Sequence, residues 1–141
     1  MESRSLYTFT AVQIVAFAAV LWLLFSWPAA WDVQRCIGTA LVVAGLGGIA
    51  TARYQLGKSF AIKAEAHQLV TGGVYSKIRN PIYVFGIVLL AGIVLAVHRP
   101  TLWLLVLAMA VVQTLRARRE ARVLEAAFGD AYREYRRNTW F

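Results

Sequence analysis

Four long apolar segments limit this chain to very few folds. They contain no Asp, Glu, Lys or Arg, and they occupy residues 6–27, 37–52, 82–97 and 102–115. A helix needs about 20 apolar residues to cross a hydrocarbon core of about 30 Å. The first segment is long enough, whereas the last two are shorter and suit an incompletely spanning hairpin. We therefore predict an all-α, polytopic membrane protein with about four transmembrane helices and a further C-terminal helix at the cytoplasmic face.

The composition favours a single integral membrane domain over residues 1–141. Hydrophobic residues make up 60% of the chain and charged residues only 16%, whereas soluble domains are nearer half and a quarter. Two N-terminal spans would occupy residues 6–52, and residues 53–137 would hold a polar loop, the hairpin and the C-terminal helix. The first segment is too long for the core of a signal peptide and lacks a clean Ala-x-Ala-like site, so we expect an uncleaved anchor.

The net charge of +8 is distributed as in a membrane protein rather than a nucleic-acid-binding protein. If the chain crosses four times from an inner N-terminus, every Lys and Arg except Arg35 and Arg99 falls on one side. This asymmetry predicts that both termini are cytoplasmic. We expect the bacterial inner membrane or an equivalent membrane, with membrane lipid and no nucleic acid as partner. The outer interface would then carry a cluster of tryptophans: Trp27, Trp31 and Trp103.

Sulfur and imidazole groups are too sparse for a metal centre. The chain has one cysteine, Cys36, and two histidines, His67 and His98, that are far apart in sequence. We therefore predict neither a metal site nor an intrachain disulfide. The glycines of the second apolar segment are expected to serve helix packing, with Ala44 and Gly48 as a small-xxx-small pair.

Two polar regions flank the predicted hairpin. A loop over residues 53–80 is expected to fold against the membrane face, and Pro81 then opens the third helix. Residues 116–137 are helical by propensity, and Gly129 is expected to end or bend that helix. Glu120 shares a helix face with the apolar Leu124, and Arg116, one turn earlier, can pair with it.

These two regions meet at one end of an antiparallel hairpin, because short connections make neighbours of successive helices. The pocket between them would offer a cation (Arg79 or Arg116), the Glu120 carboxylate, two phenols, an amide and apolar walls: Tyr75, Tyr83, Asn80, Leu69, Val70 and Pro81. Such a set suits an amphoteric ligand with a carboxylate, an ammonium, ribose hydroxyls and a flat base. The alternative is that the cations are ordinary membrane anchors and that Arg116 and Glu120 form an exposed ion pair.

Two motifs resemble those of the isoprenylcysteine carboxyl methyltransferase family, within the wider group that includes phospholipid methyltransferases. The first is His67-x-Leu69-Val70-Thr71-x-Gly73-Val74-Tyr75-x-x-x-Arg79-x-Pro81-x-Tyr83. The second is Arg116-x-x-x-Glu120-x-x-x-Leu124-x-x-x-Phe128-Gly129-x-x-Tyr132-x-x-Tyr135. The resemblance covers about residues 53–137, and the first two helices match only as generic spans.

The resemblance implies an integral membrane enzyme that uses S-adenosylmethionine at the cytoplasmic face and releases S-adenosylhomocysteine. Its lipophilic acceptor would enter from the bilayer, with a carboxylate as in prenylcysteine-type substrates, or else a lipid amine, hydroxyl or thiol. Arg116 and Glu120 would be the catalytic residues. The cofactor-binding residues carried over by position are His67, Leu69, Val70, Gly73, Tyr75, Arg79, Asn80, Pro81, Tyr83 and Glu120. A small non-enzymatic membrane protein is the alternative of another class, and the oligomeric state is open.

The chain departs from the family pattern at three positions. Asn80 stands where the family usually has histidine, so the side chain there can hydrogen-bond but cannot carry a proton. Ala121 replaces the second of two adjacent acids. Phe85 replaces a glycine, with Gly86 one place later. The first two bear on cofactor contacts, and the third bears on the shape of the acceptor pocket.

Overall fold

The computed structural model describes residues 2–62 and 69–141, so His67 lies outside the described residues. Within them the chain is helical and contains no strand, which confirms the all-α prediction. The helices are α1 (Glu2–Ser26), α2 (Val33–Ile62), α3 (Pro81–Val97), α4 (Trp103–Phe128) and α5 (Asp130–Arg137), with short 3-10 turns η1 (Gly73–Ser76) and η2 (Pro100–Leu102).

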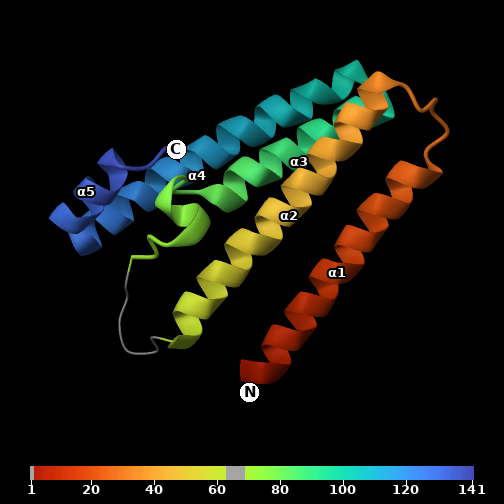
Figure 1. Cartoon of the computed structure of the whole chain (residues 1–141). Coiled ribbons are helices and arrows are strands. Elements are labelled where there is room, and N and C mark those ends of the chain that lie inside the picture. Colours follow the sequence, from red (N-terminus) through yellow and green to blue (C-terminus); the bar gives the residue numbers. More distant parts are fainter. Residues whose placement is uncertain (1, 63–68) are drawn as a thin grey trace.

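The long helices α1 to α4 run in alternating directions (Figure 1). The connections at 27–32 and 98–102 therefore lie at one end of the bundle, which we call the turn end. The last turns of α2, the start of α3, the last turns of α4 and all of α5 lie at the opposite end, which we call the site end. The two polar regions that were predicted to meet therefore lie at the same end of the molecule.

Among the residues that the structure describes, two stretches of helix are long and apolar enough, by length and composition, to cross a membrane: Val33–Gly57 and Pro100–Phe128. Two further apolar stretches, Ile14–Ser26 and Pro81–Val97, are shorter. Many large apolar side chains along these helices are exposed, as expected of surfaces that face lipid. Long apolar helices with exposed apolar side chains are typical of helical membrane proteins, and the count of four crossings stays a prediction.

The predicted loop over residues 53–80 is wrong in its first part, because α2 continues to Ile62. The apolar segment ends at Ala52, but the next residues carry no proline and include Ala, Arg, Gln and Leu, all favourable in helices. The backbone therefore continues as a helix after the apolar pattern has stopped. This extension carries Arg53 and Gln55 to the site end.

The predicted boundary before Arg116 is also wrong, since α4 runs without a break from Trp103 to Phe128. A change from apolar to charged side chains does not interrupt backbone hydrogen bonding. The break comes at Gly129, which has φ of +53°, a conformation that glycine adopts at little cost. The separate C-terminal helix is α5, and the predicted end or bend at Gly129 is confirmed.

Glycines allow α2 and α3 to pack with their backbones close together. A Cβ on Gly38 would lie 2.6 Å from the backbone N of Ala96, and one on Gly45 would lie 2.8 Å from Leu89. Gly92 of α3 is equally close to α2. Of the predicted small-xxx-small pair, Gly48 packs against Phe85. Ala44 lies on an exposed side of α2 and does not take part in this packing.

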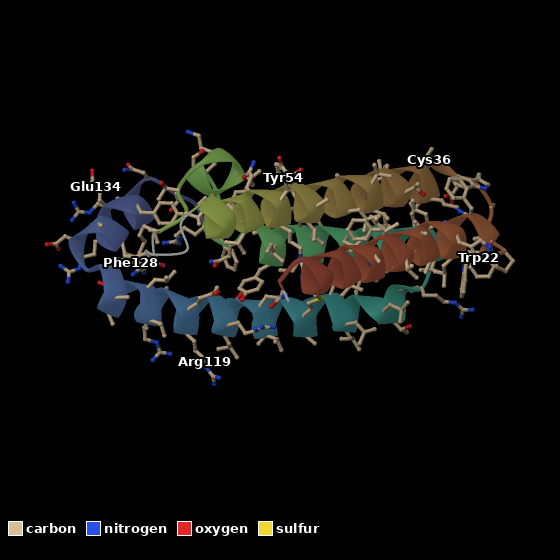
Figure 2. All side chains as sticks on the ribbon, turned by 90° about the horizontal axis from the view of Figure 1, so that it is seen from below. Trp22, Cys36, Tyr54, Arg119, Phe128 and Glu134 are labelled. Carbon is tan, nitrogen blue, oxygen red and sulfur yellow. The ribbon has the colours of Figure 1, made fainter. Side chains whose placement is uncertain are left out.

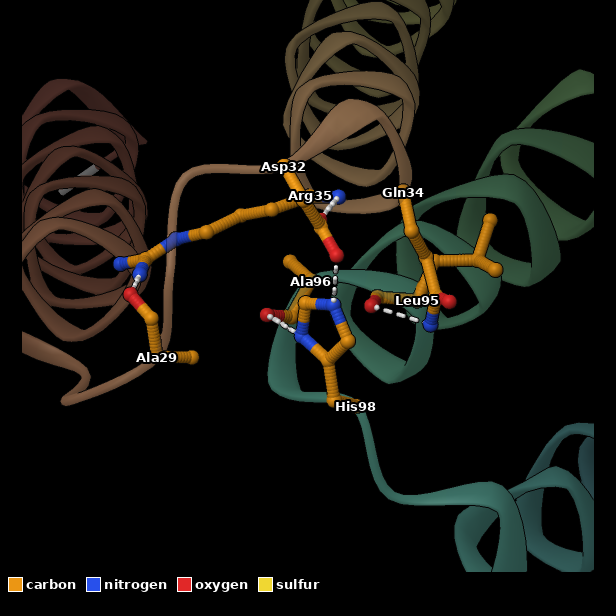
Figure 3. Close-up of polar contacts among 7 residues, drawn as sticks. All are labelled: Ala29, Asp32, Gln34, Arg35, Leu95, Ala96 and His98. Atoms are coloured by element: carbon orange, nitrogen blue, oxygen red, sulfur yellow. Dashed lines mark hydrogen bonds and ion pairs between the residues drawn. The ribbon is translucent and has the colours of Figure 1, made fainter.

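A polar cluster closes the turn end (Figure 3). The buried Arg35 guanidinium donates to the carbonyl of Leu24 in the last turn of α1 and to those of Trp27 and Ala29 just after it. Carbonyls in the last turn of a helix lack partners within the helix. Asp32 accepts from the backbone N–H of Arg35 at 2.8 Å and contacts His98 Nε2 at 2.9 Å. These two hydrogen bonds lower the pKa of the Asp32 carboxyl. The cluster ties the first connection of the bundle to the turn after α3.

Candidate active site

The loop that leads into α3 is held by α2. The backbone N–H of Val74 donates to Gln55 Oε1 at 2.9 Å. Gly73 has φ of +61°, and a Cβ there would lie 2.4 Å from the Gln55 amide. Glycine is therefore favoured at this position by its conformation, and a Cβ would also require the Gln55 side chain to move. The extension of α2 and the motif glycine together set where η1 begins.

Tyr83 of α3 and two residues of α4 form the centre of the candidate site. Tyr83 Oη donates to Glu120 Oε2 at 3.0 Å, and the Arg116 guanidinium carbon lies 5.6 Å from the centre of the Tyr83 ring. That separation is within the range of cation–π attraction. In the described part of the chain Arg116 and Glu120 form no direct ion pair, contrary to the expected pairing. They meet instead through Tyr83.

Tyr75 adds a second phenol close to the same carboxylate. It is buried in η1, and this burial raises the pKa of its phenol, with the negative charge of Glu120 adding to the rise. The positive charge of Arg53 acts in the opposite direction. Arg53, from the extension of α2, therefore shares this end of the bundle with Glu120 and both phenols.

The charge of Arg79, the second cation of the site, acts on two tyrosines of α5. The pKa of Tyr132 and that of Tyr135 are both raised by burial, Tyr135 to about 12, and the nearby charge of Arg79 opposes both rises. Tyr135 Oη donates to the carbonyl of Tyr75 at 2.8 Å, so α5 is fastened to η1. Arg79 is thus close enough to the phenols of α5 to affect them electrostatically, while Glu120 lies beside Tyr83.

The remaining predicted residues lie along the same entry loop. Leu69 and Val70 are partly buried ahead of η1, and Pro81 is fully buried as the first residue of α3. The amide of Asn80 donates from Nδ2 to the carbonyl oxygen of Phe141 at 3.1 Å. Asn80 therefore has a backbone partner within the chain itself.

This donor set fits a zwitterionic ligand that carries a sulfonium. A guanidinium at Arg79 can bind a carboxylate through a two-pronged hydrogen bond. A carboxylate at Glu120, with the rings of Tyr75 and Tyr83 nearby, favours a cationic group. These are the opposite charges that the S-adenosylmethionine side chain presents. Among the described residues no group of His, Cys, Asp and Glu could hold a metal ion.

Sequence reasoning missed several residues of the site. Gln55 and Arg53 were assigned to a loop, although the helix-forming composition after Ala52 was a usable signal. Tyr132 and Tyr135 were noted only as part of a motif. The contacts of Trp140 and Phe141 with the entry loop had no sequence signal, because single backbone pairings leave no periodic pattern.

Fold and site together define a helical membrane protein with a polar site at one end of a helical hairpin. A family model described as phospholipid methyltransferase matches residues 33–131. The chain therefore belongs to the phospholipid methyltransferase family, a family of membrane methyltransferases. No curated protein and no solved structure matches the chain.

The family match confirms the wider group to which the motifs were assigned. It begins at Val33 and so includes all of α2, whereas the sequence motifs were placed only over residues 53–137. The inclusion of α2 agrees with the structure, because Gln55 of α2 holds the loop that leads into α3 and the glycines of α2 pack against α3. The match ends at residue 131, just before Tyr132.

Proposed function

We propose that this protein transfers a methyl group from S-adenosylmethionine to a lipophilic acceptor that reaches the site from the bilayer. The observation that carries the proposal is the hydrogen bond between Tyr83 of α3 and Glu120 of α4. It joins the two motif regions in a chain that belongs to a methyltransferase family. It also puts a carboxylate and a phenol at the site end of two apolar helices.

Two groups of residues would hold the cofactor. Arg79, with Tyr132 and Tyr135 around it, would bind the carboxylate of the methionyl part. Glu120 with Tyr75 and Tyr83 would bind the positively charged part. His67, Leu69, Val70, Gly73, Asn80 and Pro81 are the further cofactor contacts that we propose from their motif positions.

The acceptor that we favour is a carboxylate, oriented by Arg116. When bound, S-adenosylmethionine supplies an electrophilic methyl group on a sulfonium. A carboxylate is already ionised at neutral pH, so this chain needs no general base. Arg116 and Glu120 are exposed in the structure, so the bound cofactor and acceptor would have to exclude water from the site. A dry site favours a reaction in which opposite charges cancel. Alignment by Arg116 and Tyr83 would provide much of the remaining rate enhancement.

A lipid amine is the second candidate acceptor. It is favoured by the position of Glu120, an exposed carboxylate beside Tyr83, and by the phospholipid methyltransferase description of the family. An amine must lose a proton before or during methyl transfer, and Glu120 is the group best placed to accept it. In this case Glu120 would be a general base rather than a group that only binds the cofactor.

We also propose that the chain crosses the membrane four times, with both termini in the cytoplasm. The distribution of Lys and Arg supports this topology. It places the site end, where Arg79 and Arg116 lie, on the side where the soluble cofactor is made. A cysteine-accessibility scan that finds residues 98–102 labelled only from the cytoplasm would contradict it.

Calorimetric titration of the purified protein with S-adenosylhomocysteine tests the cofactor. We expect binding by the wild type, and at least tenfold weaker binding by Glu120→Ala and by Arg79→Ala, each still folded. The matched control is Arg119→Ala, because Figure 2 shows Arg119 on the side of α4 that faces away from the other helices. If the wild type shows neither heat of binding nor thermal stabilisation at millimolar ligand, the proposed methyltransferase function is excluded.

Labelled S-adenosylmethionine and a panel of lipid carboxylates, amines, hydroxyls and thiols then separate the acceptors. A carboxylate acceptor predicts that Arg116→Gln loses more activity than Glu120→Gln at saturating cofactor. An amine acceptor predicts the reverse order and an activity that rises with pH, since the free amine is the nucleophile. Transfer to no member of the panel by a protein that binds the cofactor would contradict the lipophilic acceptor.

A further inference from the structure

Residues 139–141, which we call the C-terminal strap, run beside the loop that enters α3. The backbone N–H of Trp140 donates to the carbonyl of Lys77 at 2.7 Å, and that of Arg79 donates to the carbonyl of Trp140 at 3.0 Å. Ile78 and Trp140 thus form an isolated parallel bridge. Figure 1 shows the C-terminal end of the chain beside the start of α3, far from it in sequence.

The strap also holds the residue that follows Arg79. The carbonyl oxygen of Phe141 accepts two hydrogen bonds from Asn80, one from the backbone N–H at 3.2 Å and one from Nδ2 at 3.1 Å. The backbone is therefore bonded to the strap immediately before and immediately after the Arg79 side chain. No other residue among the proposed cofactor contacts is enclosed in this way within the described chain.

The strap is itself anchored to α5. Thr139 Oγ1 donates to the carbonyl of Tyr135 at 2.7 Å, and Tyr135 Oη donates to the carbonyl of Tyr75 at 2.8 Å. Hydrogen bonds thus connect η1 to α5, α5 to the strap, and the strap to the loop that enters α3. The Arg79 charge acts on Tyr132 and on Tyr135, and Tyr135 takes part in the bonds to both η1 and the strap.

Burial of apolar surface is not the main contribution of the strap. The Trp140 side chain is 66% exposed, so its ring adds little to a packed core. What the strap supplies is geometry, since arginine has many rotamers and a loop without long-range bonds would leave its Cα free to move. A charged group that is already in place binds its partner with less loss of entropy.

We infer that the C-terminal strap is a positioning element of the cofactor site, which acts by holding Arg79 where it binds the cofactor carboxylate. This inference rests on the proposed use of S-adenosylmethionine. The strap touches no reacting atom, and its effect passes through the backbone of residues 77–80. Cofactor affinity should therefore depend on the Trp140 N–H and not on the Trp140 ring.

Two substitutions at one position separate these contributions. Trp140→Pro removes the N–H that bonds Lys77, whereas Trp140→Ala removes the ring and keeps the N–H. We expect Trp140→Pro to raise the Kd for S-adenosylhomocysteine at least tenfold, and Trp140→Ala to stay within twofold of the wild type. In an Arg79→Gln background, Trp140→Pro should change the Kd less than twofold, because the group that the strap positions is gone. A merely structural strap would weaken binding by the same factor in both backgrounds.

The outcomes are distinguishable from failure of the proposed function. A wild type that binds no S-adenosylhomocysteine overturns the function and the inference together. A wild type that binds, with Trp140→Pro equal to Trp140→Ala, overturns the inference alone. If Trp140→Pro does not fold, hydrogen exchange of the wild type decides. Amides of Arg79 and Asn80 that are protected before ligand is added support the strap, and amides that exchange as fast as exposed loop amides overturn it.

Discussion

Tyr83 connects the two helices of the hairpin through one side-chain hydrogen bond to Glu120. Its ring also lies under the Arg116 guanidinium. A single phenol thus sets the relative position of an anion and a cation from another helix. Because the acceptor is a carboxylate oxygen, this hydrogen bond is stronger than one between neutral groups.

Tyr83→Phe should keep the ring and lose only this hydrogen bond. Hydrogen bonds to charged groups contribute about 1.5–3 kcal/mol, so we expect kcat/KM for methyl transfer to fall about tenfold or more. Labelled-methyl transfer measures the effect. Tyr54→Phe is the control, since Tyr54 is exposed on the outer side of α2 (Figure 2). Equal activity of the two variants would show that the Tyr83 hydroxyl has no part in the site.

Gly73 and Gly72 offer a matched pair for the entry loop. An alanine at position 73 needs φ of +61° and meets the Gln55 amide, whereas a Cβ on Gly72, at φ of −93°, meets nothing within 4 Å. We expect Gly73→Ala to lower the free energy of unfolding by about 1–3 kcal/mol and Gly72→Ala to leave it nearly unchanged. Thermal unfolding in detergent measures both. A Gly73→Ala variant as stable as Gly72→Ala would contradict the packing of η1 against α2.

The seam between α2 and α3 is the element on which the site depends. It brings Gly38, Gly45 and Gly92 within backbone contact of the facing helix. Without a hydrophobic driving force inside lipid, such close approach and the packing it allows drive helix association. The same α2 carries Gln55 to η1 at its far end. A change in the seam therefore moves the wall of the site.

Gly45→Ala and Gly47→Ala test the seam with the same chemical change. A Cβ on Gly45 would lie 2.8 Å from Leu89, whereas one on Gly47 meets nothing within 4 Å. We predict that Gly45→Ala costs about 1–3 kcal/mol through overpacking, and that Gly47→Ala is neutral or stabilising by up to about 1 kcal/mol through helix propensity. Chemical denaturation followed by circular dichroism gives both values. The reverse order would mean that α2 and α3 meet along another face.

At the scale of the whole molecule, the two ends of the bundle are closed by different chemistry. The turn end is closed by the charged groups of Arg35 and Asp32 and by the imidazole of His98. The site end is closed by phenols, above all by the bond from Tyr135 to the carbonyl of Tyr75. Phenols stay neutral far above neutral pH, so the site end should open only in alkali.

The stability of the protein at alkaline pH should depend on the hydrogen bond from Tyr135 to the Tyr75 carbonyl. Burial raises the pKa of Tyr135 from 10.0 to about 12, so folding favours the neutral phenol. Its contribution is complete below pH 10 and is lost as the pH rises through 12. We expect the Tm to fall in this window. Tyr135→Phe should be about 1 kcal/mol less stable at neutral pH but show a shallower alkaline fall, whereas Tyr54→Phe should retain the full fall. Parallel curves for all three proteins would exclude Tyr135 as the group that titrates.

Local features of the sequence predict the helical membrane class, the third helix from Pro81, the break at Gly129 and the family. These follow from local properties, namely uncharged apolar length, the restricted backbone of proline and the freedom of glycine at positive φ. Motif order also indicated correctly that Tyr83 and Glu120 belong to one site end.

Tertiary packing sets how far α2 extends, which side of it packs, and what holds the entry loop. The helix continues past Ala52 through backbone hydrogen bonds, and a change in side-chain polarity does not show where these end. The choice of Gly45 over Ala44 for the seam depends on the rotation of α2 against α3. The bonds from Gln55 to Val74 and from Trp140 to Lys77 join residues far apart in sequence. Such pairings arise from the packing of whole helices, so no local pattern encodes them.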